Sequence, residues 1–249
     1  MNHSRVLATF VGLAYLIGWG TWFLLVLLSR ETGLDAAEFS SRIEAWDLAG
    51  VDAALPDWLL YLLTRVQDFA FSIAGVVVVG LTAGREGLRE LFGRLVRFAI
   101  SSKWYLLGLL PVAIYLVAVL LANNGDPDFS GGAITTAFFS LGSGLLVSIL
   151  LRGAMGEELG LRGFAVPHLR RTMSATRASL VIGVVWWAWH LPILVSRDLL
   201  SNVAFFLVAI GLSFVFTWLF EGSGGSLIPV LLFHGTQNWE DGFEVFFPS

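Results

Sequence analysis

The 249-residue sequence contains no cysteine, only one lysine and few charged residues of either sign, since Asp, Glu, Lys and Arg together make up 14% of the chain. The lack of cysteine excludes disulfide bonds, thiolate metal ligands and a cysteine nucleophile. With 19 acidic residues against 15 basic ones, the chain lacks the basic character that nucleic-acid binding needs, so we expect no nucleic acid as a partner. Hydrophobic residues make up 56% of the sequence, more than a soluble domain of this length needs, so the excess is expected to face lipid.

Long apolar runs divide the chain into candidate membrane spans. A spanning helix needs about 20 predominantly apolar residues, and runs of about this length recur along the sequence. The sequence therefore predicts an all-α fold, a polytopic transmembrane helix bundle of seven spans, with eight as the alternative. We expect residues 1–57 to form an N-terminal transmembrane helix with an acidic extramembrane segment, and residues 58–249 to form a multi-span core. The seven runs lie near 6–29, 58–83, 104–122, 134–156, 178–195, 203–220 and 225–246.

Basic residues concentrate in two connections between these runs, 84–103 and 157–177. Lys and Arg near span ends are enriched on the cytoplasmic side of a membrane, so both connections are expected to be cytoplasmic. Alternation of the spans then places the N-terminus inside and the acidic segment 30–57 outside. The sequence thus predicts a multi-pass protein of the cell membrane with a cytoplasmic N-terminus.

Three polar clusters interrupt the apolar runs. Ionisable groups at membrane depth cost about 2.5–3.5 kcal/mol each on insertion scales, so their presence in a span is a functional hypothesis by default. The clusters are Glu157 and Glu158 with Arg162, then Trp186 with His190, then His234 with Asn238.

The spacing within each cluster indicates which side chains meet, because residues four apart share one face of a helix. Glu158 is expected to pair with Arg162, whereas Glu157 points elsewhere and remains available. A carboxylate without a partner in a poorly solvated cavity is a credible general base. His190 can share a proton with a water held by Glu157, and His234 with Asn238 can donate hydrogen bonds to an oxyanion. Together these groups describe the attack of water on an amide carbonyl.

The three clusters resemble the motifs of the CPBP family of membrane proteins, which includes CAAX prenyl proteases and bacteriocin-processing enzymes. The family pattern is Glu-Glu-x-x-x-Arg, then Phe-x-x-x-His, then His-x-x-x-Asn/Asp on successive helices. Here the order and spacing match, with Trp186 in place of the usual phenylalanine, and the resemblance covers about residues 84–240. It implies an intramembrane endopeptidase in which Glu157 and His190 activate the water. His234 and Asn238 would form the oxyanion site, and Glu158, Arg162 and Trp186 would be structural support.

The resemblance also bears on partners. It implies a peptide or protein substrate at the membrane, alongside the membrane lipids themselves. Prenylated C-terminal tails, bacteriocin leaders and membrane-anchored regulators are all substrates within the family, and the sequence does not choose between a lipidated and an unmodified one.

Other interpretations of the same residues stay open. Glu158 and Arg162 can form an ion pair without a catalytic role, and the two histidines can simply hydrogen-bond one helix to another. At the level of the whole protein, the rivals are a non-catalytic membrane scaffold or immunity-type protein and a proton-coupled transporter.

A metal-dependent mechanism is a further alternative. No cofactor is favoured, but zinc held by Glu157, His190 and His234 would have enough ligands and an open position. No His-Glu-x-x-His motif occurs.

Two polar features outside the motifs are given structural interpretations. Arg65 and Asp68 are expected to neutralise each other within the second span. His168 follows a proline in a basic connection and is expected to be solvated.

Overall fold

The computed structural model describes residues 3–35, 38–39, 42, 55–122, 142–194 and 197–238, and its described part is helical throughout, which confirms the all-α prediction. The helices are α1 (His3–Thr32), α3 (Asp57–Asp68), α4 (Ala70–Gly93), α5 (Ser102–Gly108), α6 (Leu110–Ala122), α8 (Gly153–Gly160), the π-helix η1 (Leu161–Ala165), α9 (Val166–Leu169), α10 (Ala175–Trp189), α11 (Leu191–Leu194), α12 (Leu199–Gly222) and α13 (Ile228–Gln237).

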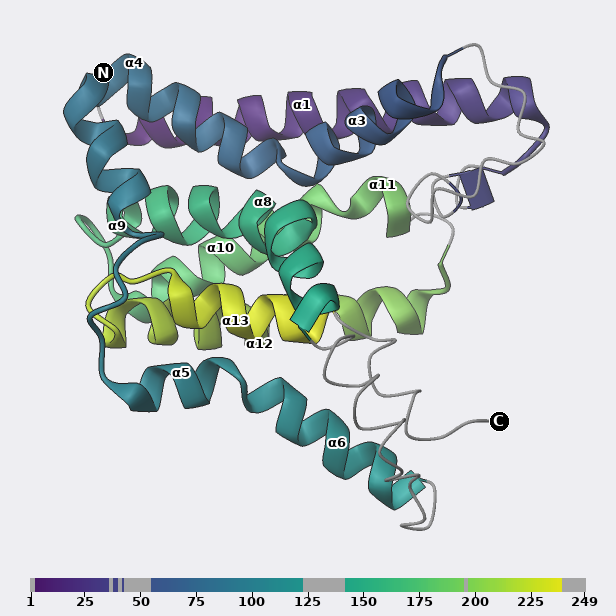
Figure 1. Ribbon diagram of the computed structural model, residues 1–249. Helices are drawn as coiled ribbons and strands as arrows, with labels where there is room; N and C mark the ends of the chain where they lie inside the picture. The colour runs from purple at the N-terminus through teal and green to yellow at the C-terminus, as the bar shows by residue number, and fades with distance from the viewer. Residues whose placement is uncertain are drawn as a thin grey trace.

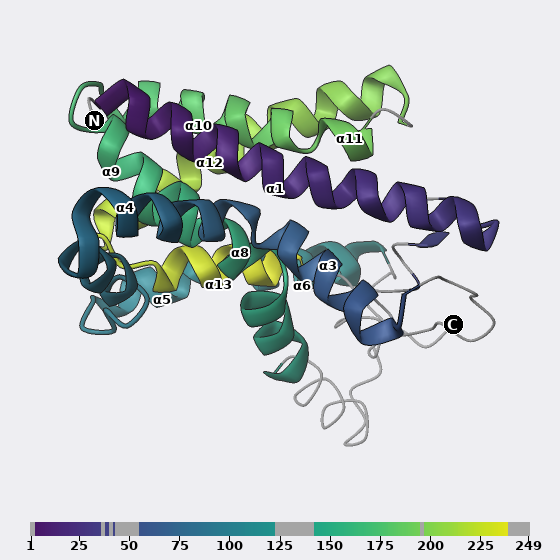
Figure 2. The ribbon, with the colours of Figure 1, turned by 90° about the horizontal axis from the view of Figure 1, so that it is seen from above.

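The helices form a layered bundle (Figures 1 and 2). Helix α1 lies beside α3 and α4, and α4 packs against α8. Beneath them in Figure 1, α10 packs along α12, and α13 contacts both α8 and α5. Helix α8 and its continuation η1 therefore lie in the middle of the bundle, in contact with several longer helices.

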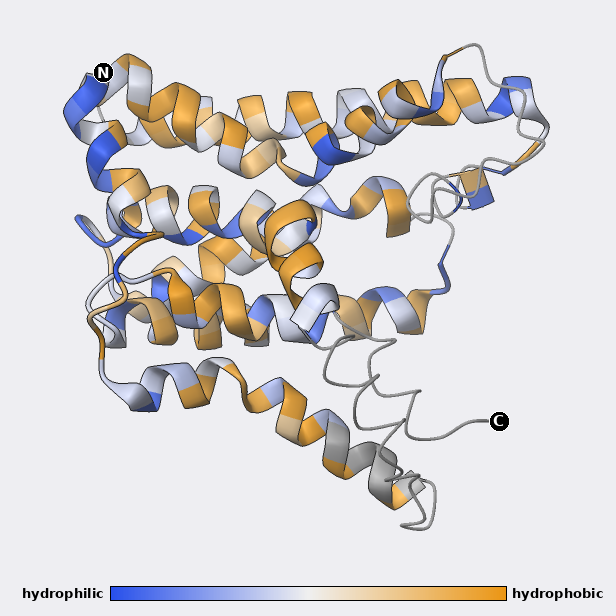
Figure 3. Cartoon of the chain, in the orientation of Figure 1, coloured by the Kyte–Doolittle hydropathy of each residue, from blue (hydrophilic) through white to orange (hydrophobic). Residues whose placement is uncertain are grey.

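Apolar residues extend along the outer surfaces of the helices, as expected for a protein surrounded by lipid (Figure 3). Three helices, Ser4–Thr32, Ala70–Gly93 and Leu199–Gly222, are long and apolar enough to cross a membrane. These features confirm a polytopic helical bundle. The count of seven spans stays a prediction, and the run near 134–156 lies partly outside the described residues.

Several predicted spans are broken rather than continuous. The run near 58–83 contains two helices, which meet at Phe69 (φ −89°, ψ 9°). The run near 104–122 is divided at Leu109 (φ −93°, ψ 3°), and the run near 178–195 is divided at His190. Such local departures from helical geometry leave no trace in the average hydropathy of a run, so the sequence did not reveal them.

Helix α4 turns sharply at Gly84, which has φ 60° and ψ −151°. This left-handed region is open to glycine at little cost and is strained for other residues. The second half of the helix therefore folds back, and a Cβ on Gly87 would lie 2.5 Å from Cβ of Ala83. The turn separates the apolar first half of α4 from its charged second half, which holds two arginines and two glutamates.

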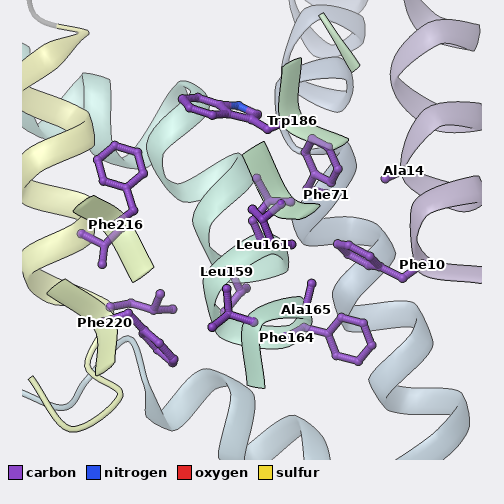
Figure 4. Packing of buried hydrophobic residues seen from close by; sticks show 14 of the residues in the cluster. Phe10, Ala14, Phe71, Leu159, Leu161, Phe164, Ala165, Trp186, Phe216 and Phe220 are labelled. Carbon is purple, nitrogen blue, oxygen red and sulfur yellow. The ribbon is translucent and has the colours of Figure 1, made fainter. Parts of the chain in front are cut away.

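A single large hydrophobic cluster unites the helices around η1 (Figure 4). Phe10 of α1 packs against Phe71 of α4 and Phe164 of η1, with ring centroids 6.0 and 5.0 Å apart. Helix α1 thus contributes to the same core as the helices that carry the polar motifs. The proposed division of the chain at residue 57 stays a prediction.

The basic connection 84–103 and the second part of the other one, residues 166–177, lie at one end of the bundle together with the N-terminus, whereas residues 157–165 lie in its middle (Figure 1). The turn between α12 and α13 lies at the same end and is bonded to the connection 84–103. Arg97 donates to the carbonyl oxygen of Gly224, and Ser226 Oγ donates to the carbonyl oxygen of Arg97 at 2.9 Å. The end of α1 that precedes the acidic segment lies at the opposite side of the figure.

Candidate active site

Glycines fix the position of the helix that carries the paired glutamates. A Cβ on Gly156 would lie 2.3 Å from the carbonyl oxygen of Asp68, and one on Gly160 would lie 2.1 Å from that of Phe71. Only glycine permits this approach, so the backbone of α8 rests directly on the junction of α3 and α4. Both Glu157 and Glu158 are held in the interior, with exposed fractions of 5% and 0%.

Glu158 is the centre of a buried hydrogen-bond network that joins four helical elements. Its Oε1 accepts from Arg162 Nη1 at 2.9 Å, as the helical spacing predicts, and also lies 2.8 Å from His234 Nδ1. Arg162 Nη2 donates to Ser213 Oγ on α12 at 3.0 Å. Arg162, Glu158 and Ser213 are fully buried. The contact between Glu158 and His234 was not expected, and it makes Glu158 a partner of the histidine as well as of the arginine.

Arg162 lies in the five-residue π-helix η1 rather than in a regular α-helix. Single π-turns inside helices are rare and are frequently found at functional sites. The guanidinium also lies over the rings of Phe216 and Trp186, with its carbon 4.8 and 5.5 Å from the ring centroids. These aromatic faces stabilise a cation that is removed from water.

Trp186 contacts both histidines. Its ring lies edge-on to His190 and His234, with centroid distances of 5.8 and 5.7 Å. Phe216 stacks on the other side of His234 at 5.3 Å. The aromatic residue of the second motif therefore forms a wall in contact with both imidazoles and with Arg162, and Figure 4 shows Trp186 and Phe216 at the edge of the core.

His190 occupies the end of α10, and its Nδ1 lies 2.8 Å from the carbonyl oxygen of Trp186. A carbonyl oxygen only accepts hydrogen bonds, so Nδ1 carries the proton and Nε2 of the neutral ring keeps a lone pair. The same reasoning applies to His234, whose Nδ1 faces a carboxylate oxygen. In both histidines the nitrogen that remains for a ligand, a water or a substrate is Nε2.

Glu157 and Asn238 lie close to each other beside Gly153. A Cβ on Gly153 would lie 3.2 Å from Glu157 Oε1 and 3.6 Å from Asn238 Nδ2. The other oxygen of Glu157, Oε2, is buried and has no hydrogen-bond partner within the described part of the chain. Glu157 thus has an unpaired carboxylate oxygen, as predicted, but it does not point away from its neighbour, because ligand atoms of Glu157, Glu158 and His234 lie within 4.8 Å of one another.

The structure therefore brings most, but not all, of the predicted site residues into direct contact. Glu157, Glu158, Arg162, His234 and Asn238 come together directly. His190 contacts the ring of Trp186, which also touches His234, and the contact expected between His190 and Glu157 is not among the hydrogen bonds of the described residues.

Three side chains of the site could together bind a metal ion, but they are not the three that were expected from the sequence. The atoms grouped within 4.8 Å come from Glu157, Glu158 and His234, so Glu158 takes the place of His190. Both glutamates keep a buried oxygen without a partner among the described residues. Three such donors match the ligand count of a catalytic zinc site.

Two features of the site were missed at the level of sequence. Ser213 bonds the arginine from α12, and it could have been noticed as a hydroxyl inside an apolar run. Helix α1 also flanks the second motif, because Trp19 Nε1 donates to the Trp189 carbonyl at 2.8 Å and Tyr15 donates to the Val185 carbonyl at 2.7 Å. No spacing rule connects residues so far apart in the chain.

Comparison with known proteins agrees with this site. Residues 138–239 match the family model described as Type II CAAX prenyl endopeptidase Rce1-like, and every residue of the predicted site falls within that segment. The chain is also 28% identical, over 194 residues and 70% of each chain, to CAAX prenyl protease 2 of Methanococcus maripaludis. The chain is thus similar to CAAX prenyl proteases of the CPBP family. These similarities confirm the predicted CAAX-protease-like intramembrane endopeptidase and the multi-pass membrane location, and they favour neither the scaffold nor the transporter. This CAAX-type protease acts on a peptide or protein substrate at the membrane.

Proposed function

We propose that this CAAX-type protease hydrolyses a peptide bond with a water activated by Glu157 and His190. The observation that carries this proposal is the buried, unpaired Oε2 of Glu157, one residue away from a Glu158 that is already engaged by Arg162 and His234. Glu157 can accept the proton of the water, and His190 Nε2 can accept a hydrogen bond that orients it.

The oxyanion that forms as water attacks the carbonyl needs hydrogen-bond donors. Asn238 offers its amide next to Glu157, and His234 offers Nε2 if its ring is protonated. The proton held by Glu157 passes to the leaving nitrogen, so the products are a carboxylic acid and an amine, which then ionise to a carboxylate and an ammonium group.

A bound zinc is the alternative. Glu157, Glu158 and His234 would hold it, and it would supply a Lewis acid that polarises water. In that arrangement Glu157 would be a ligand and no unpaired carboxylate would remain nearby as the base, so we favour activation by Glu157 itself.

We propose that the substrate is a prenylated C-terminal tail, as the name of the relative CAAX prenyl protease 2 suggests. Purified full-length protein in detergent should cleave a peptide with a farnesylated cysteine much faster than the same peptide with an unmodified cysteine. Equal rates for the two peptides would show that the enzyme does not recognise the prenyl group. If the protein cleaved a bacteriocin leader but neither of these peptides, the proposed substrate would be wrong.

We also propose that the N-terminus and both basic connections face the cytoplasm of a cell membrane. The proposal is supported by the arginine asymmetry and by the grouping of residues 84–103, residues 166–177 and the α12–α13 turn at one end of the bundle. Because the chain has no cysteine, single cysteines at positions 90 and 172 can be labelled in intact cells. If an impermeant reagent labels either cysteine from outside the cell, the proposed orientation is wrong.

A further inference from the structure

The carbonyl oxygen of Gly163, in the middle of η1, lacks the donor that an α-helix would provide. In an α-helix the carbonyl of each residue accepts from the backbone N–H four residues later. For Gly163 that residue is Pro167, which has no N–H. Gly163 is buried, and a buried carbonyl without any donor costs free energy. This carbonyl therefore depends on a donor other than the usual helical one.

Arg94 supplies a donor to this carbonyl from outside the helix. Its Nη1 donates to the Gly163 carbonyl oxygen, and its Nη2 lies 2.7 Å from Glu90 Oε1. Arg94 directly follows α4, and its side chain is only 14% exposed. A hydrogen bond from a charged donor is stronger than one between neutral groups. Because Gly163 directly follows Arg162, this bond anchors the backbone beside the buried arginine of the site.

A second carbonyl of η1 is also bonded by a side chain. His168 Nδ1 lies 3.1 Å from the carbonyl oxygen of Phe164, and the two rings contact each other with centroids 4.3 Å apart. A carbonyl oxygen only accepts hydrogen bonds, so Nδ1 is the donor. The His168 side chain is half-buried, so the solvated position expected from the sequence is wrong. Side chains thus complete the bonding of η1 at two successive residues.

Arg94 also connects η1 with the other helices of the site. Its guanidinium carbon lies 5.6 Å from the ring centroid of Phe220 on α12. Its backbone carbonyl accepts from the N–H of Leu227 at 3.0 Å, and Leu227 directly precedes α13. Arg94 therefore contacts all three of the elements that hold Arg162, Ser213 and His234.

We propose that Arg94 is a positioning residue for the peptidase, which holds η1 in the π conformation by bonding the Gly163 carbonyl. A π-turn contains one more residue than an α-turn, so its loss would rotate Arg162 relative to Glu158 and Ser213. Arg162 bonds these two side chains at 2.9 and 3.0 Å, and a rotation would disturb both bonds. This role rests on the proposed function, because it assigns Arg94 to the turnover of the same site.

The test compares kcat with KM for the full chain in detergent, using the farnesylated peptide. Arg94→Met removes the donor and should lower kcat about 100-fold with little change in KM, since a misplacement of about 1 Å by a residue far from the chemistry can cost this factor. Pro167→Ala restores a backbone N–H four residues after Gly163, so the double variant should regain most of the lost kcat. If Arg94 acted only through Phe220 or Glu90, Pro167→Ala would not rescue it.

Two control variants change neighbouring bonds and leave the Gly163 carbonyl bonded. Glu90→Gln removes the ion pair of Arg94, and Arg97→Met removes an arginine of the same connection that bonds Gly224 instead. Both should keep the wild-type kcat. If Arg94→Met does not fold, Arg94→Lys replaces it in the comparison, because its single nitrogen must then serve two partners. Pro167→Ala should raise the kcat of that variant as well.

NMR of protein labelled at histidine reports on the same network without a substrate. The chain has four histidines, so the Nδ1–H signal of His234 can be assigned by comparison with His234→Gln. This signal should shift in Arg94→Met, because Glu158 bonds both His234 and the displaced Arg162, and it should return when Pro167→Ala is added.

The two measurements separate the possible failures. If the His234 signal shifts and returns as expected but the wild type cleaves no farnesylated peptide, the proposed substrate is wrong and the positioning by Arg94 stands. An unshifted signal in folded Arg94→Met, a wild-type kcat in that variant, or a loss that Pro167→Ala does not restore would each overturn the role of Arg94.

Discussion

Replacement of Arg162 by methionine tests the buried network most severely. The guanidinium is fully buried and bonds both Glu158 and Ser213. Removal of one partner from a buried ion pair costs about 3–5 kcal/mol, because the remaining charge stays in an apolar interior without compensation. Glu158 would keep its contact with His234, so we expect a loss near the lower limit, about 3 kcal/mol.

The assay is the free energy of unfolding in detergent for the wild type, Arg162→Met, Glu158→Gln and the double variant. The double variant should be more stable than the sum of the two single losses predicts, since each single variant leaves one buried charge unpaired. Glu90→Gln is the matched control. It breaks another i,i+4 pair, with Arg94, but the Glu90 side chain is 69% exposed, so the loss should stay below about 1 kcal/mol.

The reasoning would be refuted if Arg162→Met were no less stable than Glu90→Gln. The pair between Glu158 and Arg162 would then behave as a surface ion pair, which would contradict its complete burial. Additive losses in the double variant would equally show that the two charges are not coupled.

Three further predictions concern the network, the packing of α8 and the metal. Ser213→Ala should cost about 1–3 kcal/mol of unfolding free energy, because a buried guanidinium N–H loses its acceptor, whereas Thr217→Val one turn later should be neutral, since that hydroxyl has no partner among the described residues. Gly160→Ala should lower the melting temperature by forcing a Cβ onto the Phe71 carbonyl, at a cost of about 1–3 kcal/mol or more, while Gly12→Ala, with open space around it, should not. Protein stripped of metal should keep its activity and should not respond to zinc. Stoichiometric zinc, with activity lost on stripping and recovered on zinc addition, would establish the metal mechanism instead.

The sequence predicts the fold class because membrane insertion depends mainly on the length and apolarity of each run. It predicts helix boundaries less well. The break at Phe69 directly follows the polar stretch Arg65–Asp68, which was interpreted only as an ion pair within one span, and the reversal at Gly84 depends on one backbone conformation. Glycines also occur inside regular helices, so Gly84 alone did not indicate a reversal.

Within the site, local contacts could be predicted and contacts between helices could not. The pair between Glu158 and Arg162 follows from helical periodicity. The bond between Glu158 and His234 joins residues 76 positions apart, and the contact of Trp186 with both imidazoles depends on how α10 packs against α13. Spacing rules apply along one helix, whereas the order of helices around a centre is decided by packing.

The most direct test of the central claim compares the turnover of wild-type protein with that of Glu157→Gln, using a farnesylated peptide substrate. Loss of a general base typically costs about 10²–10⁴-fold in rate, so we expect such a loss with an unchanged melting temperature, because Glu157 lacks the ion pair that holds Glu158. If Glu157→Gln keeps near-normal turnover, Glu157 is not the base and the proposed mechanism is wrong.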